Sequence, residues 1–135
     1  MHGLRDLNGK MDTPDRLAQA KRLLKISQAV SEPEDLRVIC GDFNVEPDSE
    51  TIRLLEADGL VELVKHYGFE TTRNSYYKKP GKFADYMLID QIEQISTFQV
   101  LQKPEVSDHC PLVLTLNSDV TEAKQQRAHS DIEAT

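Results

Sequence analysis

The segment Phe83–Ile89, FADYMLI, is apolar at nearly every position, and this constrains the fold more than any other feature of the chain. In a strand, alternate side chains point to opposite faces, so this one would present apolar residues on both. The segment Cys110–Leu116 has a similar pattern. Strands that are buried on both faces need a covering layer on each side of their sheet. The chain must therefore supply or recruit two layers.

Two stretches have the pattern of helices that would form one such layer. In residues 12–30, Asp12 or Thr13 can cap the N-terminus, Pro14 suits the first turn, and apolar residues recur on one face. A second helix is predicted within residues 48–59, which begin with the cap formers Asp and Ser and end in Gly. Two helices cover about one face of a sheet, so something else should cover the second.

Short apolar and β-branched runs predict the strands. They are Leu36–Cys40, Leu60–Val64, Ser75–Lys78, Phe83–Ile89, Ile95–Leu101 and Cys110–Leu116. We expect an α/β fold with one mixed, mainly antiparallel sheet and helices on one face. Residues 1–116 show no linker that would divide them, whereas residues 117–135 are polar, lack an apolar stripe and predict a disordered or weakly helical tail.

The composition is that of a globular protein, with 135 residues, 39% hydrophobic and 29% charged. No window approaches the ~20 apolar residues of a membrane span, and the N-terminus lacks a signal-peptide core, so we expect a cytoplasmic protein without a membrane partner. The net charge of −7 leaves nucleic acid open but does not favour it. Cys40 and Cys110 lie in apolar segments without metal-site spacing, which favours buried thiols.

The sequence RVICGDFNVEPDS, residues 37–49, runs from an apolar strand directly into an acid and an amide. Asp42 and Asn44 are two residues apart, so in an extended segment both side chains would project to the same side, with Phe43 pointing away. A carboxylate and an amide there suit a phosphate or a hydrated metal ion. The alternative is a loop in which both residues make local turn hydrogen bonds.

A second cluster, SDHCPL at residues 107–112, stands at the start of an apolar strand. His109 is suited to moving a proton near neutral pH, and Asp108 is a hard oxygen ligand for Mg²⁺ or Mn²⁺. A catalytic imidazole needs a group that orients it, and Asp85, an acid inside the apolar run FADYML, is the candidate. A surface turn is the alternative for the Asp-His pair.

Taken together and in this order, GDFN, ADYMLI and SDHCPLVLTL resemble the endonuclease/exonuclease/phosphatase superfamily of metal-dependent phosphoesterases. The opening HGL and the segment DTPDRLAQAKRLL also resemble a mid-domain strand end and helix of that family. The resemblance implies a four-layer, DNase I-like α/β sandwich of two similar sheets with helices outside. Residues 1–116 resemble the C-terminal half of that domain.

The resemblance implies a role for each acid and amide at the two motifs. Asp42 would orient the attacking water or contact the metal, and Asn44 would hydrogen-bond the nucleophile or the scissile phosphate. Asp108 would help to bind the metal. The reaction would be in-line attack of water on a phosphoester, with Mg²⁺ or Mn²⁺ offsetting the developing charge.

The resemblance also assigns the histidines. His109 would polarise the phosphoryl group or act as a base, held in place by Asp85. His2 falls where many members carry a second histidine that contacts the phosphate or the leaving group. Tyr76 and Tyr77 could help to hold a substrate, with an exposed hairpin as the alternative.

The resemblance leaves out the N-terminal half of the domain, which normally supplies an Asn and a metal-binding Glu. Without that Glu we expect weak metal binding and little hydrolysis from this chain alone. The sheet face that would pack on the other half would be left open, so a homodimer or a separate N-terminal half is the expected partner. Two functions follow: an incomplete phosphoesterase acting on a phosphoester of unknown class, or a non-catalytic remnant that serves as an assembly module.

Overall fold

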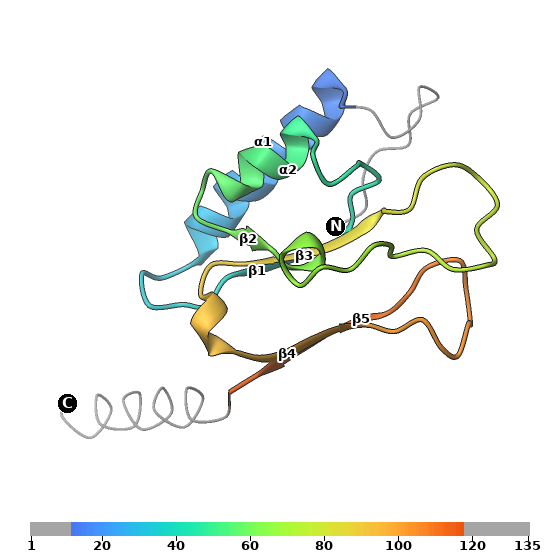
Figure 1. The fold of residues 1–135 in the computed structure, drawn as a ribbon. Helices are drawn as coiled ribbons and strands as arrows, with labels where there is room; N and C mark the ends of the chain where they lie inside the picture. The colour runs from blue at the N-terminus through green and yellow to red at the C-terminus, as the bar shows by residue number, and fades with distance from the viewer. Residues whose placement is uncertain (1–11, 118–135) are drawn as a thin grey trace.

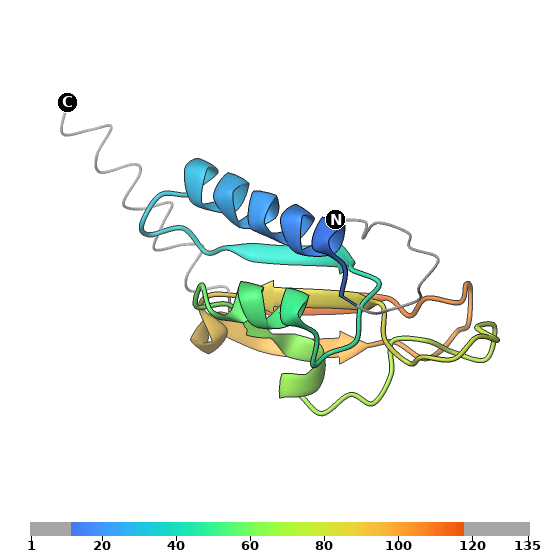
Figure 2. The same cartoon turned by 90° about the horizontal axis from the view of Figure 1, so that it is seen from above.

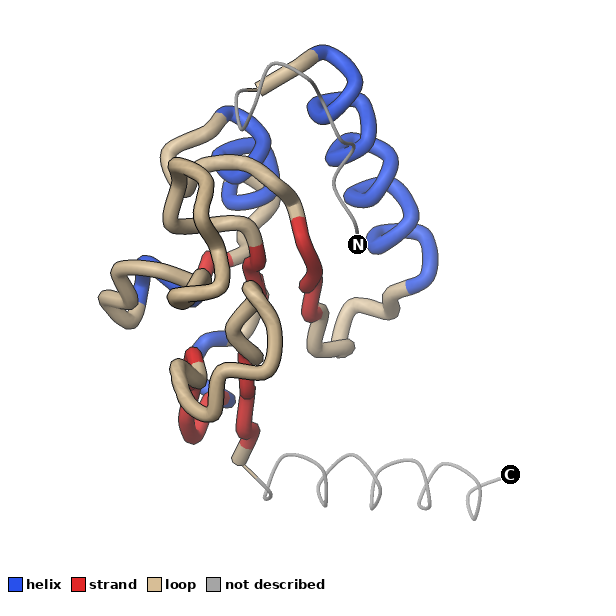
Figure 3. Tube along the Cα trace, turned by 90° about the vertical axis from the view of Figure 1, so that its right-hand side faces the viewer, coloured by secondary structure: helices blue, strands red, loops and turns tan. Residues whose placement is uncertain are grey.

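The computed structural model describes residues 12–117, and its two longer helices lie within the segments that the sequence predicts to be helical. Helix α1 spans Pro14–Val30, and the Thr13 hydroxyl caps it by accepting a hydrogen bond from the backbone of Arg16 at 3.2 Å. Helix α2 spans Glu50–Glu56, and the Ser49 hydroxyl caps it in the same way. Both helices lie on the same side of the strands (Figures 1 and 3).

The central ladder is antiparallel and has the order β1–β3–β2. Its strands are β1 Val38–Asp42, β2 Val61–Glu62 and β3 Asp85–Ile89. The β1–β3 register places Asp42 opposite Asp85 at one end of the ladder. Side chains that point toward the helices, such as Ile39, Tyr86 and Leu88, are fully or almost fully buried and form the core with α1 and α2. Figure 2 shows α1 running beside β1.

The second ladder pairs β4 Ile95–Val100 with β5 Leu112–Leu116, after the short 3₁₀ helix η1 Ile92–Gln94. The expected single sheet is therefore two antiparallel ladders within residues 12–117. Residues 72–73 connect them. The backbone N–H of Thr72 donates to the carbonyl of Lys82, and the carbonyl of Thr72 accepts the backbone N–H of Cys110. Arg73 and His109 form an antiparallel bridge at this junction. The α/β fold class of the sequence analysis is confirmed.

One predicted strand is wrong, and another is shorter than predicted. Ser75–Lys78 forms a turn, in which Tyr77 donates to the Asn74 carbonyl, so its two tyrosines do not alternate into a sheet. Leu60–Val64 changes from β2 to the short helix α3, Leu63–His66. The buried Glu62 carboxylate causes the change, because it accepts the N–H groups of Val64 and Lys65 and so caps a helix where a strand was expected.

One face of the sheet is covered only in part by the described residues. Cys40 is exposed, and Val38, two residues earlier on the same face, is 39% exposed, so the expectation that Cys40 is a buried thiol is wrong. Cys110 is buried as expected. Met87 of β3 and Leu112 of β5 line a hollow together with Cys40. We call the surface of Val38, Cys40, Met87 and Leu112 the open face. The predicted tail lies outside the described residues, apart from Asn117.

Asp12 fastens the start of α1 to α2. Its carboxylate accepts the backbone N–H groups of Glu50 and Thr51, at 2.8 and 3.0 Å, and the Thr51 hydroxyl at 2.8 Å. Burial acts to raise the pKa of Asp12, but these hydrogen bonds together outweigh it and leave the pKa below its usual value. The folded state therefore stabilises the charged form of Asp12.

The substitution Asp12→Ala should lower the free energy of unfolding by about 1–2 kcal/mol at pH 7. The depressed pKa makes this contribution fully present above the unfolded pKa, and it is lost as the pH falls through the folded one. Urea unfolding at pH 7 and at about pH 2.5 measures the difference. Asp48→Ala, at an exposed acid just before α2, is the control and should change stability by less than about 0.5 kcal/mol. Equal losses in both variants would contradict the assignment.

Candidate active site

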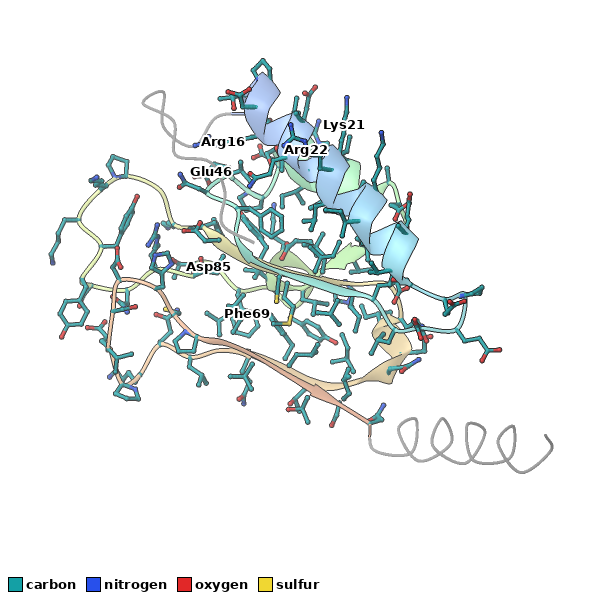
Figure 4. The ribbon with its side chains drawn as sticks, turned by 180° about the vertical axis from the view of Figure 1, so that it is seen from behind. Arg16, Lys21, Arg22, Glu46, Phe69 and Asp85 are labelled. Atoms are coloured by element: carbon teal, nitrogen blue, oxygen red, sulfur yellow. The ribbon has the colours of Figure 1, made fainter. Side chains whose placement is uncertain are left out.

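Three predicted site residues converge from separate parts of the chain. Asp42 ends β1, Asp85 begins β3, and His109 stands just before β5. The antiparallel register places the two acids opposite each other, and the bridge between Arg73 and His109 brings the imidazole to the same edge. One potential ligand atom from each of Asp42, Asp85 and His109 lies within 4.8 Å of the others. Figure 4 shows Asp85 at the loop end of β3, away from α1.

The contact expected between Asp85 and His109 is present. Nδ1 of His109 donates to Oδ2 of Asp85 at 2.7 Å. The Asp85 side chain is 16% exposed and that of His109 is 38% exposed, so the carboxylate anchors an imidazole that reaches solvent. Burial raises the pKa of Asp85, the neighbouring Asp42 charge adds to the rise, and the hydrogen bond from His109 opposes it. The hydrogen bond from His109 therefore stabilises the charged form of the Asp85 carboxylate.

Arg73 is the site residue that sequence reasoning missed. Its Nη1 lies 3.0 Å from Nε2 of His109 and 3.3 Å from Oδ2 of Asp108. Because a guanidinium has no acceptor, Nε2 of His109 accepts this bond, and the imidazole proton stands on Nδ1, toward Asp85. The signal in the sequence, one arginine in the polar run TTRNS, does not separate a site residue from a surface residue.

Local hydrogen bonds fix the loops that carry these side chains. The Ser107 hydroxyl accepts the backbone N–H of His109 and donates to its carbonyl, both at 3.0 Å. After β1, the loop is held by Tyr86, whose hydroxyl donates to the carbonyl of Val45 at 2.7 Å. Burial raises the pKa of Tyr86 well above its usual range, so the phenol stays protonated and remains a donor. The tyrosine of the ADY motif therefore orders the GDFN loop.

The other predicted residues stand apart from this group. Asn44 has a φ of 53°, in the left-handed region, so the premise that it extends alongside Asp42 is wrong. The reason is that Phe43 and Asn44 both donate their backbone N–H to the carbonyl of Ala84, which turns the chain. Asp108 pairs with Arg73, and its Oδ1 is 3.9 Å from Nε2 of His109. His2 lies outside the described residues.

The side chains of this group carry ligand atoms of the chemical type that binds a divalent cation. Asp42 and Asp85 offer the hard carboxylate oxygens that Mg²⁺ and Mn²⁺ prefer, and Oδ1 of Asp42 is buried. The two carboxylates face each other across a hollow that also reaches the open face. Both nitrogens of His109 are engaged, Nδ1 by Asp85 and Nε2 by Arg73, so in this arrangement the imidazole offers no free nitrogen to a metal. Within residues 12–117, the clustered acids are fewer than the about six oxygen ligands of a Mg²⁺ site.

The fold and this site define an α/β domain with an acid-anchored histidine beside paired carboxylates. Residues 8–109 match the sequence model of the Endonuclease/Exonuclease/phosphatase family, and the chain belongs to that family. No curated protein matches the chain. The family assignment confirms the resemblance carried by the three motifs, and it makes the chain a member of a phosphoesterase and nuclease-type superfamily. None of the described helices is both long and apolar enough to span a membrane.

The geometry predicts the tautomer of His109. A long-range ¹H–¹⁵N NMR spectrum of the imidazole should show the proton on Nδ1. The substitution Asp85→Asn should populate the Nε2–H tautomer, because an amide can donate to Nδ1 where a carboxylate only accepts. Asp90→Asn, at the other end of β3, is the matched control and should leave the imidazole signals in place. An Nε2–H tautomer in the parent protein would contradict the geometry.

Proposed function

We propose that the chain provides the histidine half of a divalent-metal-dependent phosphoesterase site, which hydrolyses a phosphoester by in-line attack of water. The observation that carries the proposal is the group of Asp42, Asp85 and His109, with its 2.7 Å hydrogen bond between the acid and the imidazole. An imidazole oriented by a half-buried carboxylate is an arrangement suited to proton transfer and charge stabilisation. Membership of the family supports the same chemistry.

Each residue has a distinct task in this proposal. Asp85 holds His109 by Nδ1, and Nε2, which now accepts from Arg73, is the nitrogen that would contact the phosphoryl group or move a proton. Asp42 orients the attacking water or binds the metal, and Asp108 contributes a further carboxylate from the opposite side of the imidazole. Asn44, in the left-handed turn after β1, would hydrogen-bond the nucleophile or the phosphate. A bound Mg²⁺ or Mn²⁺ would offset the negative charge that develops on the phosphoryl oxygens.

The affinity of the site for the metal ion should limit the rate of phosphoester hydrolysis. A Mg²⁺ site needs oxygen ligands on several sides, and the described group offers two clustered carboxylates. We therefore propose weak metal binding and slow hydrolysis by this chain alone, with a further acidic ligand coming from a second polypeptide. The net charge of −7 favours a small phosphoester over a polynucleotide, whose backbone is bound through many cationic contacts.

Hydrolysis assays test the proposal directly. With Mg²⁺ or Mn²⁺, the chain should hydrolyse bis(4-nitrophenyl) phosphate or 4-nitrophenyl phosphate slowly, and EDTA should stop the reaction. His109→Ala should lower the rate about 100-fold or more, because it removes the proton-transfer group. His66→Ala, at an exposed histidine of α3, is the control and should keep the parent rate. A rate that resists both EDTA and the loss of His109 would overturn the proposal.

The open face favours a second function, that of an assembly module. Val38 is 39% exposed and Cys40 is exposed, although both belong to strands of the central ladder. A sheet face of this kind is stabilised when a second sheet packs on it. We propose a second copy of the chain as the occupant, because two copies would form a closed sandwich with like faces in contact.

Sedimentation velocity at micromolar concentration distinguishes the states. The parent chain should sediment as a dimer, and Val38→Asp should shift it to monomer by placing a charge on the open face. Val106→Asp makes the same change in an exposed loop and should remain dimeric. A parent chain that stays monomeric would exclude the second copy, and pairing with a separate N-terminal half of the domain would then be the alternative to measure.

A further inference from the structure

Arg73 is a buried cation at the junction of the two ladders. Its backbone bridges to His109, and its side chain is only 9% exposed. Removing a guanidinium from water costs free energy unless its charge and its N–H groups are met by partners. The contacts of Arg73 therefore indicate the function of its positive charge.

Arg37 shows what a structural arginine looks like in this chain. Its Nε donates to Asp90 at 3.2 Å, its Nη1 donates to Asp58 at 2.9 Å and to Ser27 at 3.2 Å, and its Nη2 donates to the carbonyl of Asp58 at 3.3 Å. All three nitrogens are engaged between two acids. The hydrogen bonds that Arg37 donates to Asp58 and Asp90 outweigh burial and raise the pKa of Arg37. Two carboxylates of the protein therefore compensate the positive charge of Arg37.

Arg73 is satisfied far less completely. Its hydrogen bonds to described residues leave from Nη1 alone, and they go to the carbonyl and carboxylate of Asp108 and to Nε2 of His109. Its Nε is buried and has no hydrogen-bond partner in residues 12–117. The contact with Asp108 is long, at 3.3 Å, and that carboxylate is 45% exposed. The guanidinium thus has a long contact with a partly exposed carboxylate, interacts with the charge of Asp85, and stands directly against the imidazole.

The ring of Tyr77 fixes the plane of this guanidinium. The Cζ atom of Arg73 lies 4.0 Å from the ring centroid. Such stacking holds a guanidinium flat while leaving its edge free for hydrogen bonding. The turn that replaced the predicted strand at Ser75–Lys78 is what brings Tyr77 to this position.

We propose that Arg73 is a phosphate-binding residue, whose guanidinium receives non-bridging oxygens of the phosphoryl group beside His109. This inference rests on the proposed function and specifies how the anion is recognised. A planar guanidinium presents parallel N–H donors that match a phosphate, which a lysine does not reproduce. On binding, phosphoryl oxygens take over contacts that Nη1 now makes with Nε2 of His109 and with Asp108. Tyr77 acts as a positioning residue for the guanidinium.

Titration of the full chain with inorganic phosphate, at constant ionic strength and without metal, tests this proposal separately from catalysis. Arginine side-chain NMR signals should shift for Arg73, together with the imidazole signals of His109. Arg73→Gln should weaken phosphate binding about tenfold or more, and Arg73→Lys by a smaller factor, because it keeps the charge but loses the parallel donors. Arg53→Gln, at an exposed position of α2, is the control and should bind as the parent does.

A second variant keeps the test decisive if the Arg73 variants misfold. Tyr77→Leu keeps the arginine and should weaken phosphate binding severalfold while the backbone NMR spectrum stays folded. Unchanged phosphate affinity in Arg73→Gln, or an absence of phosphate binding in the parent chain, would overturn the proposal. Failure of the proposed function would be recognised differently, as phosphate binding through Arg73 without metal-dependent hydrolysis.

Discussion

The antiparallel register between β1 and β3 determines which side chains meet at this site. It sets Asp42 opposite Asp85, so two carboxylates meet at one end of a ladder whose interior is apolar. Two acids at this separation repel, and a hydrogen-bond donor favours the charged form of the half-buried Asp85. His109 is that donor, and it reaches Asp85 because residues 72–73 connect the second ladder to the first. A slip of β3 by one residue relative to β1 would turn Asp85 toward the opposite face and separate it from Asp42.

The sequence carries enough information to predict the helices and the main group of site residues. Thr13 and Ser49 have hydroxyls that accept N–H groups in the first helical turn, and this local chemistry depends little on the rest of the fold. Asp85 could be linked to His109 because an acid inside an apolar strand needs a partner and a catalytic imidazole needs an acid to orient it. The motifs around these residues then identified the family to which the chain belongs.

Other features depend on contacts between distant segments, which no local pattern reveals. The left-handed turn at Asn44 arises because the carbonyl of Ala84 captures two consecutive N–H groups, and Ala84 is forty residues away in sequence. The buried carboxylate of Glu62 caps a helix where β-branched neighbours indicated a strand. Arg73 is a site residue only because the second ladder places His109 beside it. Tertiary context overrides local preference at each of these positions.

The central claim is that Asp42, Asp85 and His109 form one metal-assisted site at the edge of the open face. Titration with Mn²⁺, observed as paramagnetic broadening of backbone amide NMR signals, tests it most directly, because broadening falls steeply with distance from the ion. The account predicts that the amides of residues 41–42, 85 and 108–109 broaden first, and that Asp42→Asn removes this effect. Broadening centred on the acids at 46–50, with these amides unaffected, would contradict it.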